Sequence, residues 1–140
     1  MTATDKIEEF LKQMSLKYKK VPSEDRFILP YLIKERTFYV VIDRSDRWVR
    51  FHTRIMSQEQ LGSVDMLALT KELLIANGNL AEVKFILTGN GDIGVVGHEG
   101  LEVLTFDGFK QEYNAIPFAI GYFIENIAPK LGLKVPGFEK

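Results

Sequence analysis

The chain has 140 residues and a formal net charge of −1, with 46% hydrophobic and 26% charged residues, which is typical of a soluble globular protein. The absence of cysteine excludes disulfide bonds, thiolate metal sites and cysteine nucleophiles. The sequence has no apolar run long enough to cross a membrane and no apolar leader, so we expect one cytoplasmic domain over residues 1–140 with no membrane contact.

The first helix is predicted from apolar residues that recur with helical spacing. These residues are Ile7, Phe10, Leu11, Met14 and Tyr18. Lysines at positions 17, 19 and 20 suit the C-terminal end of a helix, and Pro22 closes it.

Three strands of an antiparallel meander follow, at residues 26–33, 37–43 and 48–55. Pro30 lacks an amide proton, so the first of these strands is expected at an edge or a bulge. In the third strand, odd-numbered residues from Val49 to Ile55 share one face, and Trp48, Arg50, His52 and Arg54 share the other.

A second helix is predicted to begin at a capping box formed by Ser57 and Gln60. Its expected apolar stripe contains Leu61, Val64, Ala68 and Ile75, with Leu67 and Leu74 beside it. Gly78 is expected to end this helix as a left-handed cap.

The last third of the chain is predicted to contain two strands and a helix. The strands are residues 81–88 and a segment that begins at Ile93, while residues 101–106 either extend the sheet or lead into the helix. Asn114 is the expected N-cap of the helix, with Pro117 in its first turn. The order α-β-β-β-α-β-β-α predicts an α+β fold with an antiparallel sheet of about five strands and three helices.

The segment GNGDIG, residues 89–94, has the G-x-G-x-x-G spacing of a dinucleotide-binding loop. In such a loop the glycines must open a helix, but the following residues, VVGHEG, disfavour one. Asn90-Gly91 between two apolar runs instead favours a type I′ hairpin. We therefore expect no cofactor.

The stretch LLIANGNLAEVKFILTGNGDIGVVG resembles the signature region of YbjN-like proteins, which belong to the type III secretion chaperone-like superfamily. The matching positions are Leu73, Leu74, Asn77, Phe85, Gly91, Asp92 and Val95. The resemblance implies a small α+β domain, often dimeric, that binds polypeptide and catalyses no reaction.

Catalytic and metal sites are not expected. The two histidines, His52 and His98, lack partners at the spacing of metal ligands, and no nucleophile elbow is present. We expect both histidines on the surface and predict a non-enzymatic protein.

Two candidate binding surfaces remain. The last helix is apolar on several sides, so it either forms a homodimer or polypeptide interface or is buried within the monomer. Its residues are Ile116, Phe118, Ile120, Tyr122, Phe123, Ile124 and Ile127. The alternative is nucleic-acid or anionic-ligand binding by a basic strip, because all six arginines lie between residues 26 and 54. The strip consists of Arg47, Trp48, Arg50 and Arg54, and its competing interpretation is a solvated face.

Overall fold

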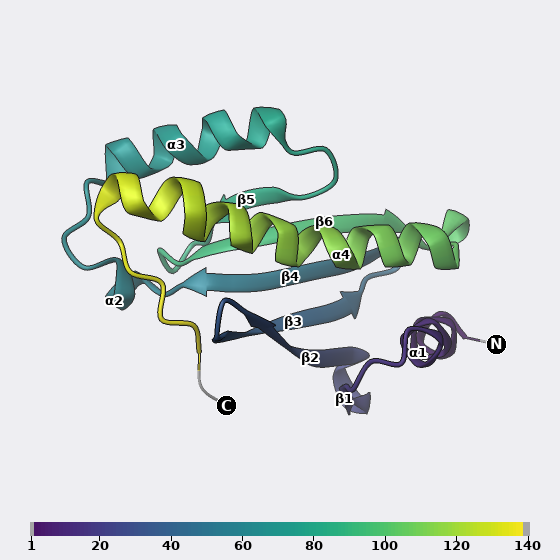
Figure 1. Cartoon of the computed structure of the whole chain (residues 1–140). Helices are drawn as coiled ribbons and strands as arrows, with labels where there is room; N and C mark the ends of the chain where they lie inside the picture. Colours follow the sequence, from purple (N-terminus) through teal and green to yellow (C-terminus); the bar gives the residue numbers. More distant parts are fainter. Residues whose placement is uncertain (1, 139–140) are drawn as a thin grey trace.

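The computed structural model describes residues 2–138 and contains a six-stranded antiparallel sheet in the order β1-β2-β3-β4-β6-β5. One helix, α4, lies across a face of this sheet, α3 lies along its β5 edge, and α1 lies near its β1–β2 end (Figure 1). The elements are α1 (Ala3–Gln13), β1 (Lys19–Val21), η1 (Pro22–Glu24), β2 (Arg26–Ile33), β3 (Arg36–Arg44), β4 (Trp48–Met56), α2 (Gln58–Leu61), α3 (Met66–Asn79), β5 (Lys84–Leu87), β6 (Ile93–Gly100), η2 (Leu101–Val103), α4 (Phe106–Tyr122), η3 (Phe123–Ile127) and η4 (Ala128–Leu131). The predicted α+β class is confirmed, with four α-helices and six strands among the described residues.

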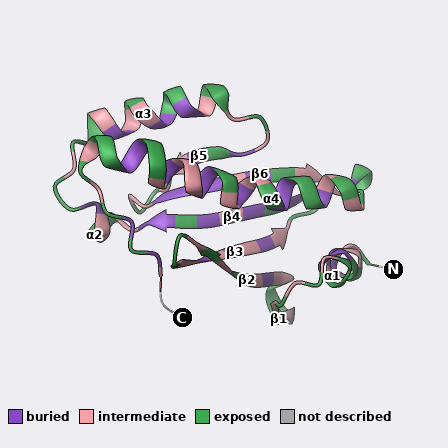
Figure 2. Ribbon diagram, in the orientation of Figure 1, coloured by how far each residue is buried: buried purple, intermediate pink, exposed green. Residues whose placement is uncertain are grey.

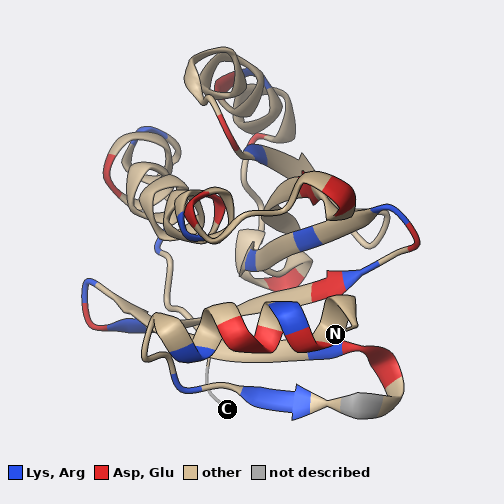
Figure 3. Cartoon of the chain, turned by 90° about the vertical axis from the view of Figure 1, so that its right-hand side faces the viewer, with Lys and Arg blue, Asp and Glu red and all other residues tan. Residues whose placement is uncertain are grey.

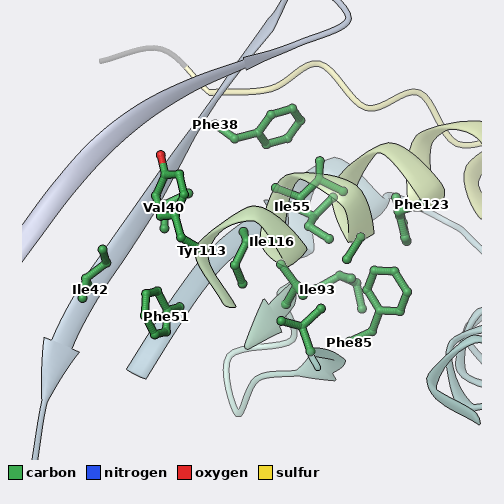
Figure 4. Close-up of a cluster of buried hydrophobic side chains, with 14 of the residues drawn as sticks. Phe38, Val40, Ile42, Phe51, Ile55, Phe85, Ile93, Tyr113, Ile116 and Phe123 are labelled. Atoms are coloured by element: carbon green, nitrogen blue, oxygen red, sulfur yellow. The ribbon is translucent and has the colours of Figure 1, made fainter. Parts of the chain in front are cut away.

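The core lies between α4 and the inner face of the sheet. Alternate residues of β3 and β4 supply it, and the alternation predicted for β4 is confirmed (Figure 2). Aromatic rings join the layers: the centroid of Phe109 on α4 lies 5.1 Å from that of Phe51 on β4. Figure 4 shows this cluster, with Phe38, Val40, Ile42, Phe51, Ile55, Phe85, Ile93, Tyr113, Ile116 and Phe123 labelled.

The first helix is shorter than predicted. It ends at Gln13, and Ser15 adopts a positive φ of 57° that turns the chain toward β1. Tyr18 therefore lies outside the helix, where its hydroxyl donates to Glu8 at 2.6 Å and its ring packs edge-on against Phe27. The apolar pattern correctly placed Tyr18 against the core, where it is partly buried, but an extended segment makes this contact in place of a helix.

The second predicted helix is two helices. The capping box at Ser57 is confirmed, yet α2 stops at Gly62, whose φ of 57° suits glycine. A new helix, α3, then starts after Asp65, whose side chain accepts from the Ala68 amide at 3.1 Å. Gly78 lies inside α3, so the prediction that it caps the helix is wrong.

The last helix begins earlier than predicted. Thr105, not Asn114, is the N-cap and accepts from the Gly108 amide at 3.0 Å. Pro117 consequently lies inside α4 rather than in its first turn. The segment 101–106 forms no sixth strand, because residues 101–103 make a 3₁₀ turn and Phe106 is already helical.

The hairpin predicted at Asn90-Gly91 is confirmed, and residues 93–100 are extended rather than helical. Its turn spans residues 88–91, because the Gly91 amide donates to the Thr88 carbonyl at 2.9 Å. A type I′ turn needs a positive φ at both central residues. Within this turn only Gly91 has one, 86°, so the predicted type I′ geometry is wrong. Two consecutive positive φ values occur instead at Lys34 and Glu35, in the β2–β3 turn.

Glu112 is a buried carboxylate on α4. It is only 4% exposed, and its Oε1 atom is buried without a hydrogen-bond partner. Gly97 on β6 leaves room for it, since a Cβ there would collide with Glu112 Oε1 and stand 2.9 Å from Val83 Cγ1. Burial, together with the negative charges of Glu99 and Glu82, raises the pKa of Glu112 to about 7.

This pKa predicts that the protein loses stability as the pH rises. The folded state holds the Glu112 proton more tightly than the unfolded state, whose pKa is 4.5, so the contribution is complete below pH 4.5 and lost as the pH passes 7. The loss is about 3 kcal/mol in the free energy of unfolding, at 1.36 kcal/mol per pKa unit. Urea denaturation should therefore show that Glu112→Gln stabilises the protein more at pH 8 than at pH 5.

Glu102→Gln is the matched control, because Glu102 is exposed. This control should shift the free energy of unfolding equally at both pH values. An equal shift for Glu112→Gln at pH 5 and pH 8 would contradict the raised pKa.

Candidate functional site

One helix keeps a row of aliphatic side chains in solvent. On α3, Leu67, Leu74 and Ile75 are 82%, 68% and 55% exposed. Leu67 and Leu74 are seven residues apart, about two helical turns, so they lie on the same side of α3. The helix buries its opposite side, which carries Leu69 and Leu73. We call Leu67, Leu74 and Ile75 the α3 apolar row.

The sequence placed these residues incorrectly. Ile75 was predicted in the buried stripe with Leu61 and Val64, but the interruption at Gly62 separates those two residues from the periodicity of α3. A helix that restarts at Asp65 buries a different side. The signal that could have revealed the break is Gly62 followed three residues later by Asp65, a strong N-cap residue.

The α3 apolar row lies beside the edge of the sheet that β5 forms. Within the described chain, β5 pairs with β6 alone. The side chain of Asn77 on α3 bonds the Phe85 backbone twice: its amide donates to the Phe85 carbonyl at 3.0 Å, and its oxygen accepts from the Phe85 amide at 2.7 Å. Leu87 on β5 is half exposed.

The residues predicted as a partner surface on the last helix are mostly internal. Ile116, Ile120, Phe123 and Ile127 are buried, so a partner docking on the surface does not reach them. Tyr122 and Ile124 are half buried. Only Phe118, 67% exposed, faces solvent. Of the two alternatives that the sequence left open, the geometry favours burial within the monomer.

The predicted basic strip lies on the outer face of β4, where Trp48, Arg50 and Arg54 are exposed. The Trp48 ring meets the His98 ring edge-on, with centroids 6.1 Å apart. Arg54 points elsewhere, and its guanidinium carbon lies 4.4 Å from the centroid of the Phe138 ring. Arg47 is exposed in the turn before β4. Trp48 and Arg54 of the predicted strip therefore contact different parts of the protein.

Asp43 on β3 neutralises the centre of this strip. Its carboxylate accepts from Arg50 at 3.2 and 3.1 Å and lies 3.0 Å from His52 Nε2. Burial alone would raise the pKa of Asp43, but the bonds from Arg50 and His52 outweigh it and hold this pKa below its ordinary value. Burial lowers the pKa of His52, and the hydrogen bond with Asp43 opposes this shift.

A shallow pocket of about 420 Å³ adjoins Trp48 and Arg50 and is the place where an anion would sit. Each arginine there already has a carboxylate partner: Arg26 bonds Glu24 at 3.1 Å, Arg44 bonds Asp25 at 3.4 Å and Arg50 bonds Asp43 at 3.1 Å. Basic and acidic residues lie close together at this end of the sheet (Figure 3). The pocket consequently offers an anion little uncompensated positive charge.

The described residues form neither a metal site nor a membrane span. Within residues 2–138, no three His, Asp or Glu side chains converge as metal ligands. None of the helices over the same residues is both long and apolar enough to cross a bilayer.

Comparison with known proteins identifies the fold. No protein-family model and no curated sequence matches the chain. YbjN from E. coli has the same fold, with a TM-score of 0.67 at 16% identity over 94% of this chain and 95% of that one. A chain of the heterodimeric ExoU–SpcU complex from the type III secretion system of Pseudomonas aeruginosa matches with a TM-score of 0.64 at 20% identity, over 89% and 97%.

A third match is the structure of the Yersinia pestis type III secretion chaperone SycH in complex with a stable fragment of YscM2. Its TM-score is 0.58 at 11% identity, over 85% of this chain and 97% of that one. The fold implied by the resemblance around residues 73–95 is therefore confirmed.

The pairing of Asp43 with Arg50 predicts how the basic strip behaves toward a polyanion. Wild type should be retained only weakly by heparin, because Asp43 already compensates Arg50, and Arg50→Ala should lower the eluting salt concentration little further. Asp43→Asn keeps the shape but removes the negative charge, so it should elute later. Strong retention of wild type that is lost in Arg50→Ala would contradict this and support the anion-binding alternative.

Proposed function

We propose that this protein is a non-enzymatic, chaperone-like domain that binds polypeptide and associates with a second copy of itself. The observation that carries the proposal is the α3 apolar row beside β5, with Leu67 and Leu74 each more than two-thirds exposed. A cytoplasmic location and a single domain over residues 1–140 belong to the same proposal.

The α3 apolar row suits contact with an identical row. Burying a leucine side chain contributes about 1.5–3 kcal/mol to the free energy of association. In a two-fold dimer each residue of the row is buried in both copies, so this contribution counts twice. Gly78 lies one turn beyond Leu74, and a Cβ there would meet nothing within 4 Å, so a neighbouring helix has room to approach. Self-association through α3 replaces the self-association predicted through the last helix, whose apolar residues are mostly occupied in the core.

A polypeptide partner has a separate place to bind. β1 pairs with β2 only along residues 26–28, so within the described chain residues 29–33 have a free edge. Leu32 on this edge is 69% exposed. Extended peptides add to such edges through main-chain hydrogen bonds, while exposed apolar side chains beside them set preference.

The fold comparisons support this proposal. Two matched structures are complexes of a type III secretion protein with a second polypeptide, and one of these complexes contains the type III secretion chaperone SycH. The alternative function, binding of nucleic acid or an anionic ligand by Arg47, Trp48, Arg50 and Arg54, is supported by the exposure of Trp48 and weakened by the carboxylate partners of the neighbouring arginines.

If α3 forms the contact between two copies, a single charged side chain placed on it should weaken the dimer. Wild type should sediment as a dimer at tens of micromolar, and Leu74→Glu should raise the dimer dissociation constant at least tenfold, because it places a carboxylate in an apolar contact. Sedimentation velocity over a concentration series measures both.

Leu32→Glu is the matched control, since Leu32 and Leu74 are 69% and 68% exposed. This variant should dimerise like wild type. A wild type that stays monomeric to high micromolar concentration, or a Leu32→Glu variant that dissociates as readily as Leu74→Glu, would overturn the assignment to α3.

A further inference from the structure

Two central strands of the sheet pair along only part of their length. β3 and β4 pair with each other from Val41–His52 to Arg44–Val49. The first part of β3 and the last part of β4 are therefore not paired with each other. The pairing of β4 with β6 also shifts between Arg54 and Met56. A wedge therefore opens between β3 and β4 at the end of the sheet nearest α2.

The C-terminal segment enters this wedge. It leaves the last helical turn at Gly132, whose φ is 67°, and runs past the ends of β3 and β4 (Figure 1). Val135 is buried, and the Phe138 amide donates to the Thr37 carbonyl of β3 at 2.7 Å. The segment thus supplies one main-chain bond that β4 does not.

The Phe138 ring fills the space beyond that bond. It packs against the Arg54 guanidinium of β4, with the guanidinium carbon 4.4 Å from the ring centroid. On the β3 side it meets Phe38 edge-on, with centroids 6.4 Å apart. One aromatic side chain therefore contacts both walls of the wedge.

Gly137 fits where no other residue would. Its φ is 78°, and a Cβ at this position would stand 2.9 Å from the Thr37 carbonyl oxygen and 3.0 Å from Arg36 Cβ. The wedge therefore selects a glycine followed by an aromatic residue, in an extended segment that presents an amide to Thr37.

The segment has few main-chain bonds to the sheet. Within residues 132–138, Phe138 makes the one main-chain hydrogen bond to β3, and a shallow pocket of about 510 Å³ remains beside it, between residues 35–37, Gln60 and residues 136–138. Segments with few main-chain hydrogen bonds to a sheet open locally at lower free-energy cost than the strands of the sheet. A competing peptide can therefore replace this one.

We propose that the wedge between β3 and β4 is a peptide-binding site that residues 135–138 occupy in the absence of a partner. Its ligand is an extended polypeptide segment that carries a glycine–aromatic pair, recognised by the Thr37 carbonyl, the Arg54 guanidinium and the Phe38 ring. The inference rests on the proposed polypeptide-binding function and names a second site for it, apart from the β2 edge. Regulation follows, because a partner enters the wedge only by displacing the chain's own C-terminal segment.

The test uses the full chain and a fluorescent peptide, LKVPGFEK, which repeats residues 133–140. Gly137→Val should expel the C-terminal segment through its clash with Thr37, leaving the wedge open. Fluorescence anisotropy should then show the peptide binding this variant at least tenfold more tightly than wild type, whose own segment competes at an effective concentration in the millimolar range. The same peptide with alanine for phenylalanine should bind at least tenfold more weakly.

Gly62→Val is the matched control, since Gly62 also has a positive φ but a Cβ there meets nothing within 4 Å. It should bind the peptide no better than wild type. Phe138→Ala gives a second open variant that leaves the backbone of position 137 unchanged, and circular dichroism checks that both open variants are folded.

Absence of peptide binding to folded Gly137→Val and Phe138→Ala would overturn the site, as would equal binding by wild type. Sedimentation of the Leu74→Glu variant tests the α3 contact independently, so failure of the wedge proposal and failure of the proposed function give different results.

Discussion

The packing of α4 against the centre of the sheet is the contact on which the remaining structure depends. The ring of Phe109 lies 5.1 Å from that of Phe51 on β4 and 5.4 Å from that of Phe10 on α1. In η3, which continues α4, the Phe123 ring lies 6.0 Å from that of Phe85 on β5. The two helical segments thereby tie the sheet to α1 and to the β5 edge. Ile116 and Ile120 of α4 are buried within the protein, whereas Leu67, Leu74 and Ile75 of α3 remain exposed.

Much of the fold could be predicted from local patterns, because strand alternation and capping chemistry are local properties. The alternation of β4 and the capping box at Ser57 were correct for this reason. Helix ends were less predictable where two signals competed. Thr105 and Asn114 are both good N-caps, and the earlier one is used because α4 must extend back to bring Phe106 and Phe109 against Phe10.

The candidate site was harder to predict, since hydrophobicity shows that a residue is buried but not what buries it. The last helix has more apolar residues than one contact surface needs, and the sequence does not show that α1 and the sheet cover several of its sides. The wedge between β3 and β4 depends on where two strands diverge, and the segment that fills it lies 84 positions from Arg54 in sequence, at Phe138. No local pattern encodes such a contact.

The two hydrogen bonds between the Asn77 side chain and the Phe85 backbone have a consequence for assembly. At Phe85 a side-chain amide takes the place of a neighbouring strand and satisfies the main-chain N–H and C=O that this residue would otherwise present to another chain. Another chain cannot continue the sheet at this border without first breaking two hydrogen bonds. Addition of another chain to the sheet edge at Phe85, including growth into open-ended fibrils, is therefore disfavoured.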